Sequence, residues 1–391
     1  MRKMDILFYR YNSICEADIL DVLRESGHQV DELTEEMTNK DFSDKECLAL
    51  VSSALQKKRY DMVFSINFFP IVSDVCNIFK NPYVCWIVDS PVMELYAHAI
   101  RNPWNRIFLF DYALYEEFAG ENPGCIYYLP LGANYDRLDR VIASVTKEDR
   151  QRFTADVSFV GSLYTEKCPY NDFAGQDTYL KGYLDGIIEA QEKVYGYNFL
   201  EECLSDDIVQ KFKEKVPFYY FTERFKQNDK AAMAHLYLGN KVTEQERLHL
   251  LKAVSENFDL KLYTNSDPSP LPAADYKGLA ETRNEMPKVF HLSKINLNLT
   301  SKPIRTGLPL RIWDILGAGG FLLTNYQSEI GEYFEIGKEL EVFSSEEELL
   351  QKIGYYLEHQ EERELIARRG YEKAKSMYSL KHRVQQILEL V

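Results

Sequence analysis

The stretch DMVFSINFFPIVSDVCNIFKNPYVCWIVD, residues 61–89, contains two β-rich runs with a helical pattern between them. The runs Asp61–Ile66 and Tyr83–Val88 are each followed by a polar residue, Asn67 or Asp89. Strand, helix and strand in this order form the right-handed crossover of a parallel sheet. The stretch therefore predicts an α/β fold with polar side chains at its strand ends.

The same alternation runs through the first 135 residues and returns in the second half of the chain. It predicts two doubly wound α/β domains, since each series is long enough for its own parallel sheet. The further strands that we expect are Met4–Tyr9, Gln29–Leu33, Arg106–Phe110, Cys125–Leu129, Val157–Val160, Leu260–Tyr263, Ile295–Leu299, Phe321–Thr324 and Leu340–Phe343.

The domain boundary is expected in Tyr135–Asp156, which lacks a deep apolar periodicity. We accordingly assign residues 1–150 to a first domain and 151–375 to a second. Residues 376–391 are expected to form a helix that crosses back to the first domain. A region at about 178–250, rich in helix formers, predicts a helical insertion in the second domain.

Aromatic residues gather in that insertion, and they are either core residues or part of an acceptor surface or protein interface. They are Tyr179, Tyr183, Tyr195, Tyr197, Tyr219, Tyr220 and Phe221.

Composition excludes some classes of protein. The 46 Lys and Arg residues against 61 Asp and Glu residues give a net charge of -15, which disfavours nucleic acid as a partner. No run of 18 or more apolar residues predicts a transmembrane segment, and Met4–Tyr9 is expected to be a strand rather than part of a signal peptide. We therefore expect a cytoplasmic protein, and the sequence leaves a homo-oligomer open.

The sequence lacks the motifs of several known metal-binding, nucleotide-binding and hydrolytic proteins. The seven cysteines show no C-x-x-C spacing, so neither a disulfide framework nor a zinc site is indicated. The sequence has no G-x-G-x-x-G after its first strand, no P-loop, no G-x-S-x-G and no H-E-x-x-H. It also lacks D-x-D, the carboxylate pair with which many sugar transferases chelate a cation. A metal-independent site without a bound cofactor is the remaining expectation.

The most informative motif is SKPIRTGLPLRIWDILGAGGFLLTN, Ser301–Asn325. A strand leads into a turn, Pro309 is expected as the first residue of a short helix, and the helix is expected to end at Gly317–Gly320. Free amides at such a helix start, together with basic side chains, can hold a diphosphate. The residues expected in this cradle are Lys302, Arg305, Gly307, Leu308 and Arg311, with Asp314 accepting hydrogen bonds from a ribose. The alternative is a capped surface helix with solvated arginines.

Other strand ends supply further candidates. Gly161 and Ser162 follow a strand, where a missing Cβ would let a phosphate approach; an ordinary turn is the alternative. Asp89 is a candidate general base, or else a cap for a helix starting at Ser90 and Pro91. His98 is a second candidate base, or a solvated histidine. Asp111 is expected to be a helix cap.

Two long segments carry a resemblance to a known family. SKPIRTGLPLRIWDILGAGGFLLTNYQSEIGEYFEIGKELEVF and EEELLQKIGYYLEHQEERELIARRGYEKAKSMYSLKHR resemble the C-terminal domain of group 1 glycosyltransferases, in the CgeB-like branch. WIVDSP, FDYALYEEFAG, YYLPLGAN and VSFVGSLYTEK are similar to the N-terminal domain that accompanies it.

This resemblance implies a GT-B fold, in which two Rossmann-like domains face each other across a cleft. The donor would lie on the C-terminal side and the acceptor on the N-terminal side. In the family a pair of glutamates touches the donor; Asp314 matches the second, whereas Thr306 stands at the first. Because of that departure, the sequence leaves open whether the transfer retains or inverts the configuration at the anomeric carbon. The segment from Tyr276 to Met286 matches the stretch near the nucleotide base.

The sequence therefore predicts a glycosyltransferase that moves a sugar from a nucleotide-diphosphate donor, such as a UDP-sugar, to a hydroxyl of a glycan, protein or cell-surface precursor. A nucleotide-sugar epimerase and a non-catalytic nucleotide-sugar binding protein are the alternatives.

Overall fold

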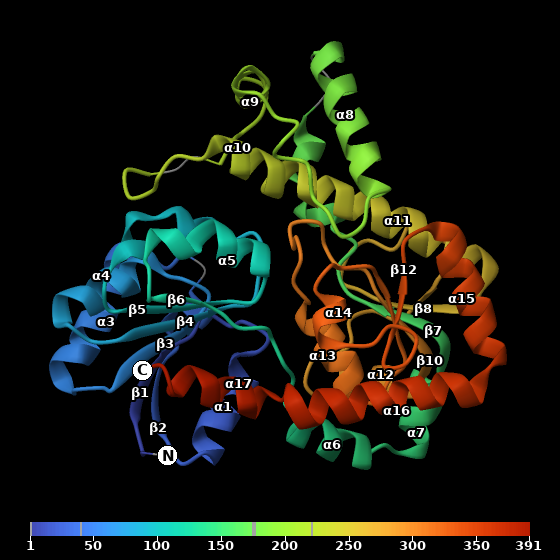
Figure 1. Cartoon of the computed structure of the whole chain (residues 1–391), viewed down its shortest axis with the longest axis horizontal. Helices are drawn as coiled ribbons and strands as arrows, with labels where there is room; N and C mark the ends of the chain where they lie inside the picture. The colour runs from blue at the N-terminus through green and yellow to red at the C-terminus, as the bar shows by residue number, and fades with distance from the viewer. Residues whose placement is uncertain (1, 40, 174–176, 220–221) are drawn as a thin grey trace. The chain divides into compact units, whose positions relative to one another are not determined.

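The computed structural model describes residues 2–39, 41–173, 177–219 and 222–391. They form two compact units (Figure 1). The first contains residues 2–134, 222–227 and 379–391, and the second contains 135–219 and 228–378. Each unit has its own six-stranded parallel sheet, so the predicted α/β fold class is confirmed.

The first sheet has the strand order β2-β1-β3-β4-β5-β6, and all its neighbours pair in parallel. Alternate side chains of β1 point to opposite faces, and both sets are buried, as expected for a sheet with helices on both sides. The strands are β1 (Asp5–Tyr9), β2 (Gln29–Leu33), β3 (Met62–Ile66), β4 (Tyr83–Ile87), β5 (Asn105–Leu109) and β6 (Ile126–Tyr128).

Helices cover this sheet. Cys47 and Val51 of α3 and Val72 and Val75 of α4 belong to one hydrophobic cluster with sheet residues such as Val63. The helices of the first unit are α1 (Glu16–Glu25), α2 (Glu35–Thr38), α3 (Asp44–Lys57), α4 (Pro70–Phe79), η1 (Met93–Tyr96), η2 (His98–Arg101), α5 (Tyr112–Phe118), η3 (Ala119–Glu121) and α17 (Leu380–Leu388).

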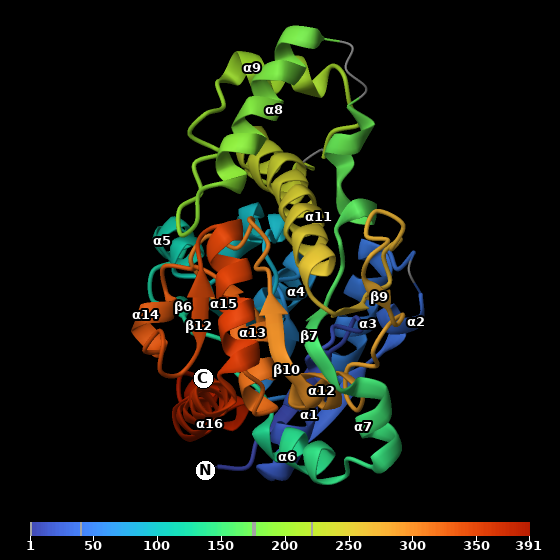
Figure 2. The ribbon, with the colours of Figure 1, turned by 90° about the vertical axis from the view of Figure 1, so that its right-hand side faces the viewer.

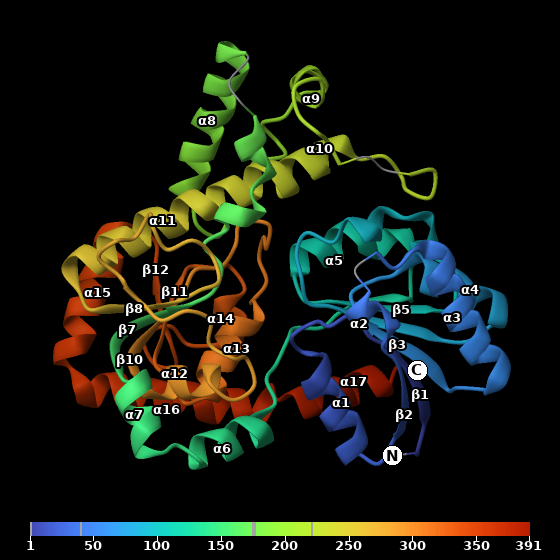
Figure 3. The same ribbon diagram turned by 180° about the vertical axis from the view of Figure 1, so that it is seen from behind.

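The C-terminal helix α17 belongs to the first unit, where it contacts α1 (Figure 3). The amide of Leu380 donates to the carbonyl of Ala133 at 2.8 Å, and Arg383 Nε donates to the carbonyl of Leu131 at 3.3 Å. The chain therefore returns to its first unit at Ser379, three residues after the expected start of the crossing helix.

The second sheet has the order β12-β11-β10-β7-β8-β9, again with parallel neighbours. Its strands are β7 (Ala155–Val160), β8 (Leu260–Tyr263), β9 (Asp275–Tyr276), β10 (Ser293–Asn298), β11 (Leu322–Asn325) and β12 (Glu341–Phe343). The sequence did not predict β9, because a two-residue strand with both residues exposed carries no periodicity.

Helices lie on both faces of this sheet as well (Figure 2). Leu250 and Leu251 of α11 and Leu349 and Ile353 of α15 share a core with one sheet face. On the other side, Asn296 of β10 donates to the carbonyl of Phe290 in α12. The helices are α6 (Tyr135–Ala143), α7 (Lys147–Phe153), η4 (Thr165–Lys167), η5 (Pro169–Asp172), α8 (Thr178–Glu192), α9 (Asp206–Lys213), α10 (Asp229–Ala232), the π-helix η6 (Met233–Gly239), α11 (Asn240–Asn257), α12 (Met286–Leu292), α13 (Leu310–Gly317), α14 (Ile330–Tyr333), α15 (Glu346–Glu358) and α16 (Gln360–Met377).

The units divide after Asn134, earlier than the expected boundary near residue 150. The expected connector is instead two helices, α6 and α7, that both contact α12. Leu138 and Phe153 supply buried apolar contacts, and Thr146 caps α7 in a capping box with Asp149. Because these helices are mostly polar, their few buried residues gave too little periodicity to be read from the sequence.

The helical insertion consists of α8, α9, α10, η6 and the first part of α11. Residues 222–227 within it belong to the first unit: Phe225 forms a β-bridge with Ala97, and the carbonyl of Arg224 accepts from the amide of His98 at 2.8 Å. Tyr179 and Tyr197 are exposed, whereas Tyr195 and Tyr219 are partly buried. Tyr220 and Phe221 lie outside the described residues. None of the helices in the described ranges is long and apolar enough to cross a membrane.

Candidate functional site

The strand order of each sheet locates its ligand-binding edge. In an open parallel sheet, ligands bind beyond the carboxyl ends of the strands, where the strand order reverses. In the first sheet this switch point lies between β1 and β3, and in the second it lies between β7 and β10. The residues that follow these four strands therefore lie at the edges where a ligand would bind.

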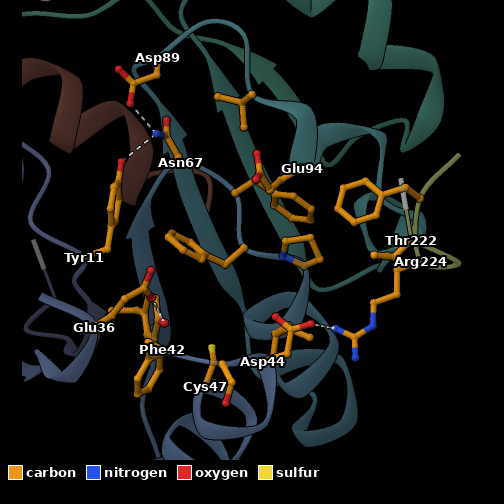
Figure 4. A pocket seen from close by; sticks show the side chains of 18 of the residues that line it. Tyr11, Glu36, Phe42, Asp44, Cys47, Asn67, Asp89, Glu94, Thr222 and Arg224 are labelled. Carbon is orange, nitrogen blue, oxygen red and sulfur yellow. Dashed lines mark hydrogen bonds and ion pairs between the residues drawn. The ribbon is translucent and has the colours of Figure 1, made fainter. Parts of the chain in front are cut away.

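A cavity of about 560 Å³ lies at the first switch point, within the size range of small-molecule sites. Tyr11 follows β1, Asn67 follows β3 and Asp89 follows β4, and all three line it (Figure 4). Arg224 and Phe225 from the 222–227 segment complete the wall. The other lining residues are Tyr9, Glu36, Phe42, Ser43, Asp44, Cys47, Phe68, Phe69, Pro70, Ile71, Pro91, Val92, Glu94 and Thr222.

Asn67 organises the polar end of the cavity. Its Oδ1 accepts from the amide of Val88 at 3.0 Å, which fixes the orientation of the side-chain amide. Its Nδ2 then donates to Asp89 Oδ2 at 2.7 Å and to the hydroxyl of Tyr11 at 2.8 Å. Asn67 has a positive φ of 57°, a conformation that asparagine tolerates better than most residues. The Asp89 carboxylate is thereby held at the rim.

The deeper carboxyl groups sit in a drier environment. Burial raises the pKa of the Glu94 carboxyl above its ordinary value. Burial also raises the pKa of Glu36, although its carboxylate accepts a hydrogen bond from Tyr9, which acts in the opposite direction. Burial raises the pKa of the Cys47 thiol to about 11, so this cysteine stays protonated near neutral pH and is unsuited to nucleophilic chemistry.

The structure distinguishes among the acceptor-side candidates. Asp89 does not cap a helix at Ser90 and Pro91, because the next helix starts at Met93, after an extended Val92. Asp111 is the N-cap of α5 and accepts from the amide of Ala113 at 3.0 Å, as predicted. The side chain of His98 is exposed and does not line the cavity, so the structure does not bring it together with Asp89 there.

At the second switch point, the buried Arg247 of α11 bridges the two central strands. Its Nη1 donates to the carbonyl of Ser162, just after β7, and its Nη2 donates to the carbonyl of Leu299, just after β10, at 2.6 Å. A Cβ on Gly161 would lie 3.8 Å from Arg247 Nη1. The predicted strand ends at Gly161 and Ser162 therefore do meet the segment that follows β10, through an arginine that the sequence analysis did not single out.

Arg311 lies in the same electrostatic environment. It is the second residue of α13, its Nη1 contacts Met286 Sδ, and its guanidinium lies 5.4 Å from the centre of the Phe290 ring. Burial lowers the pKa of Arg311, the Asp314 carboxylate raises it, and the positive charge of Arg247 lowers it. Arg247, Arg311 and Asp314 thus influence one another at one edge of the sheet.

Other predicted donor residues have structural partners. Lys302 is buried, with Nζ 3.2 Å from Glu246 Oε1 and 4.3 Å from the centre of the Tyr195 ring. The carbonyl of Gly307 accepts from Gln327 Nε2 at 3.4 Å, and the carbonyl of Thr306 accepts from the amide of Glu329 at 3.4 Å. Glu246 therefore balances the charge of Lys302 within the protein. The turn at residues 306–307 is held by hydrogen bonds from Gln327 and Glu329 to its backbone carbonyls.

The predicted donor residues Ser162, Arg305 and Tyr276 differ in their surroundings. The Ser162 hydroxyl donates to Glu166 at 2.7 Å and accepts from the amide of Tyr164 at 2.8 Å. Arg305 is half-buried. The pKa of Glu201 is lowered, mainly by its hydrogen bond with His235, and the charge of Arg305 lowers it further. Tyr276 is 47% exposed on the edge strand β9.

Helix α13 starts at Leu310, with Pro309 as its N-cap, one residue later than predicted. It ends at Gly317, and the chain leaves it through Ala318 and Gly319, whose φ is 70°. The predicted end of the helix at the glycine cluster is confirmed. Among the described residues, no group of three or more His, Cys, Asp or Glu side chains is arranged to hold a metal ion.

The C-terminal part of the chain matches a known protein family. Residues 245–389, which include most of α11 and all of β10 and α13, match the family described as "Glycosyl transferase-like". No curated protein sequence matches the chain. The C-terminal part is therefore similar to glycosyltransferases, as the sequence resemblance implied, while the CgeB-like branch and the N-terminal resemblance stay predictions.

Solved structures match over the whole chain at low identity. Anabaena HepE in complex with UDP and glucose has 13% identity and a TM-score of 0.56, covering 99% of this chain and 98% of its own. Sucrose-phosphate synthase from Thermosynechococcus elongatus has 9% identity and a TM-score of 0.58, with 100% and 98% covered. UDP-forming α,α-trehalose-phosphate synthase from Burkholderia xenovorans has 12% identity and a TM-score of 0.54, with 100% and 98% covered. These matches confirm the GT-B fold.

Proposed function

We propose that the protein is a metal-independent, cytoplasmic glycosyltransferase of the CgeB-like branch that uses a nucleotide-diphosphate sugar, with UDP-sugars as the first donors to test. The observation that carries this proposal is the pair Arg247 and Arg311 beside the switch point of the second sheet. Two guanidinium groups at a sheet's ligand edge are suited to a diphosphate, because each can donate several hydrogen bonds to its oxygens. The family match over residues 245–389 supports the same reading.

In this proposal the donor diphosphate lies near Arg311 and the first turn of α13. A hydroxyl oxygen of the acceptor forms the new bond to the anomeric carbon, and the bond from that carbon to the diphosphate oxygen breaks with its electron pair leaving on the diphosphate. The positive charges of Arg247 and Arg311 stabilise the negative charge that develops there. Asp314 binds the ribose, and the stretch from Tyr276 to Met286 lies near the base.

On the acceptor side we assign the general base to Asp89 rather than to His98. Asp89 lines the cavity and its orientation is fixed through Asn67, whereas the His98 side chain is exposed outside the cavity lining. The Asp89 carboxylate would take the proton of the attacking hydroxyl. The acceptor is a hydroxyl-bearing glycan, protein or cell-surface precursor.

Thermal unfolding in the presence of nucleotides tests the donor half of this proposal. The panel is UDP, GDP, dTDP, CDP and their sugars, each with EDTA. A ligand at 100 times its dissociation constant stabilises the protein by about 2.7 kcal/mol. We expect one nucleotide to raise the melting temperature, the shift to disappear in Arg311→Ala, and the shift to persist in Arg368→Ala, which removes an exposed arginine of α16.

Equal shifts in the wild type and in Arg311→Ala would contradict the assignment of Arg311, and no shift with any nucleotide would contradict a nucleotide-sugar donor. A donor converted into its epimer without any acceptor would identify an epimerase. Tight binding without turnover of any acceptor, including water, would identify a binding protein.

A further inference from the structure

The cavity of the first unit has walls that suit a carbohydrate. Aromatic residues line it, among them Tyr11, Phe42, Phe69 and Phe225, and the rings of Tyr11 and Phe69 meet edge to face with their centres 5.3 Å apart. Aromatic faces pack against the apolar C–H faces of sugar rings, while nearby carboxyl and amide groups hydrogen-bond the hydroxyls. The cavity thus combines flat apolar surfaces with acceptors for hydroxyl hydrogen bonds.

Acidic side chains outnumber basic ones in the described lining of this cavity. In the part of the lining that the structure describes, Glu36, Asp44, Asp89 and Glu94 carry carboxyl groups, and Arg224 is the one cationic side chain. The Arg224 guanidinium is already paired with Asp44 at 2.8 Å (Figure 4). Among the described residues, no lysine or histidine lines the cavity. Three carboxyl groups therefore face the cavity without a cationic partner in its lining.

The strongest of these charges for selectivity is Glu94. In the described part of the chain its carboxyl has no ion pair and no hydrogen bond with another side chain, and a hydrogen bond from its own backbone amide partly offsets the effect of burial on its pKa. Figure 4 shows this side chain among the labelled groups of the cavity. A phosphate or carboxylate placed beside it would have to approach an uncompensated negative charge at a site where water screens poorly. A hydroxyl or an ammonium group would meet a hydrogen-bond acceptor.

The second sheet has the opposite character. Arg247 and Arg311 lie beside its switch point. Burial lowers the pKa of both arginines, whereas the Asp314 carboxylate raises the pKa of Arg311, and Glu246 and Glu166 raise that of Arg247. The chain therefore places cations at the switch point of one sheet and carboxyl groups at the switch point of the other. In the described lining of the first cavity, the cation available to an anion is Arg224, which is already paired with Asp44.

We propose that the cavity of the first unit is an acceptor site selective for sugar units that carry neither phosphate nor carboxylate. This proposal rests on the glycosyl transfer proposed above and adds the class of acceptor. Neutral sugars and sugars with a free amine fit the cavity; sugar phosphates and uronic acids are rejected by Glu94, Glu36 and Asp89.

Three matched hexoses test the selectivity: glucose, glucosamine and glucose 6-phosphate, each at millimolar concentration. Binding is measured by saturation-transfer NMR on the full chain, which does not require turnover. We expect glucosamine to bind at least as well as glucose, and both to bind better than glucose 6-phosphate. Transfer from the donor found in the nucleotide panel should follow the same order.

The variant Glu94→Gln keeps the shape of the side chain and removes its charge. We expect it to improve binding of glucose 6-phosphate relative to glucose by about threefold or more, the effect of one unit charge about 6 Å away even at the dielectric constant of water. Glu36→Gln should act in the same direction and provides a second test if Glu94→Gln is unstable. Glu116→Gln, which removes an exposed carboxylate of α5, should leave the ratio unchanged.

The proposal is overturned if the wild type binds glucose 6-phosphate as well as glucose, if none of the three hexoses binds, or if Glu94→Gln and Glu116→Gln behave alike. These outcomes are distinct from failure of the proposed function. The nucleotide shifts report on Arg311 in the second unit and are measured without any hexose.

Discussion

Asn67 Nδ2 donates a hydrogen bond to Asp89 Oδ2 at 2.7 Å and so joins the carboxyl ends of β3 and β4. The same nitrogen donates to the Tyr11 hydroxyl, which follows β1. Because the amide of Val88 holds Asn67 Oδ1, the side chain cannot turn without breaking three hydrogen bonds. Asn67 is therefore a positioning residue for the Asp89 carboxylate.

Replacing Asn67 by glycine removes this positioning without straining the backbone, since glycine adopts a positive φ freely. We expect Asn67→Gly to lower kcat about tenfold, the consequence of losing about 1.4 kcal/mol of interaction in the transition state. The KM for the donor should stay unchanged, because the donor groups lie in the other unit. Steady-state kinetics with varied donor and acceptor separates the two constants.

Asn67→Ala is the matched control for this effect. It removes the same amide but forces a residue with a Cβ into the left-handed region, which costs about 1 kcal/mol. Its kcat should equal that of Asn67→Gly, while its free energy of unfolding should be lower. An Asn67→Gly variant with the kcat of the wild type would show that Asp89 needs no positioning.

Arg247 should be as important for stability as for binding. Arg247→Met keeps the apolar stem and leaves the carbonyls of Ser162 and Leu299 without their charged donor. We expect a loss of about 2–4 kcal/mol in the free energy of unfolding, from two hydrogen bonds to a buried charged group. Urea unfolding measures it. Arg368→Met, at an exposed position, should change the unfolding midpoint little, and an equal change in both variants would contradict the bridging role.

His249 provides a pH-dependent contact between three helices. It lies on α11, with Nδ1 2.8 Å from Glu192 at the end of α8 and Nε2 close to Glu346 at the start of α15. The hydrogen bond with Glu192 raises the pKa of His249, Glu346 raises it further, and burial opposes both. Because the folded-state pKa is raised, the stabilisation is fully present below the unfolded value of about 6.5 and is lost as pH rises through the folded-state value.

The difference in melting temperature between the wild type and His249→Gln should therefore be larger at about pH 6 than at about pH 9. The effect is small, since the imidazole is 57% exposed and solvent screens it, and high salt should reduce it. A difference that grows with pH would contradict the sign of this argument.

The short apolar runs in the sequence predicted the strands of both sheets well. The strands Gln29–Leu33 and Leu260–Tyr263 have exactly the expected bounds, because each is flanked by residues that favour turns or helices. Helices α6 and α7 could not be recognised in the same way, since their buried faces form only against α12. Such a face becomes apparent only once the partner helix is in place.

The candidate site was only partly predictable. Asn67 and Asp89 were identified because a polar residue after a buried strand must lie at the sheet edge. Arg247 was missed because it sits in an ordinary helical pattern, far along the chain from both Ser162 and Leu299, and only the order β10-β7-β8 brings these carbonyls to one guanidinium. Lys302 illustrates the converse: it follows a strand as expected, but Glu246 balances its charge.

Gly370 fixes the distance between α16 and α13, the helix that carries Arg311. A Cβ at Gly370 would lie 2.2 Å from the carbonyl oxygen of Glu339 and 2.8 Å from Leu316 Cδ2. Since the first of these is backbone, Gly370→Ala must displace α16 from the Glu339 segment, and it also crowds Leu316 of α13. We expect a loss of about 1–3 kcal/mol in the free energy of unfolding. The nucleotide-induced shift should weaken as well, because Arg311 moves with α13.

Gly354→Ala is the matched control, since its Cβ would meet nothing closer than Phe258 Cζ at 3.9 Å. Within helix α15 the added methyl group should raise stability by about 0.5–1 kcal/mol, through the lower entropy of the unfolded chain. Urea unfolding of the two variants should therefore give changes of opposite sign. Equal changes would contradict the close contact of Gly370 with the Glu339 backbone and with Leu316 of α13.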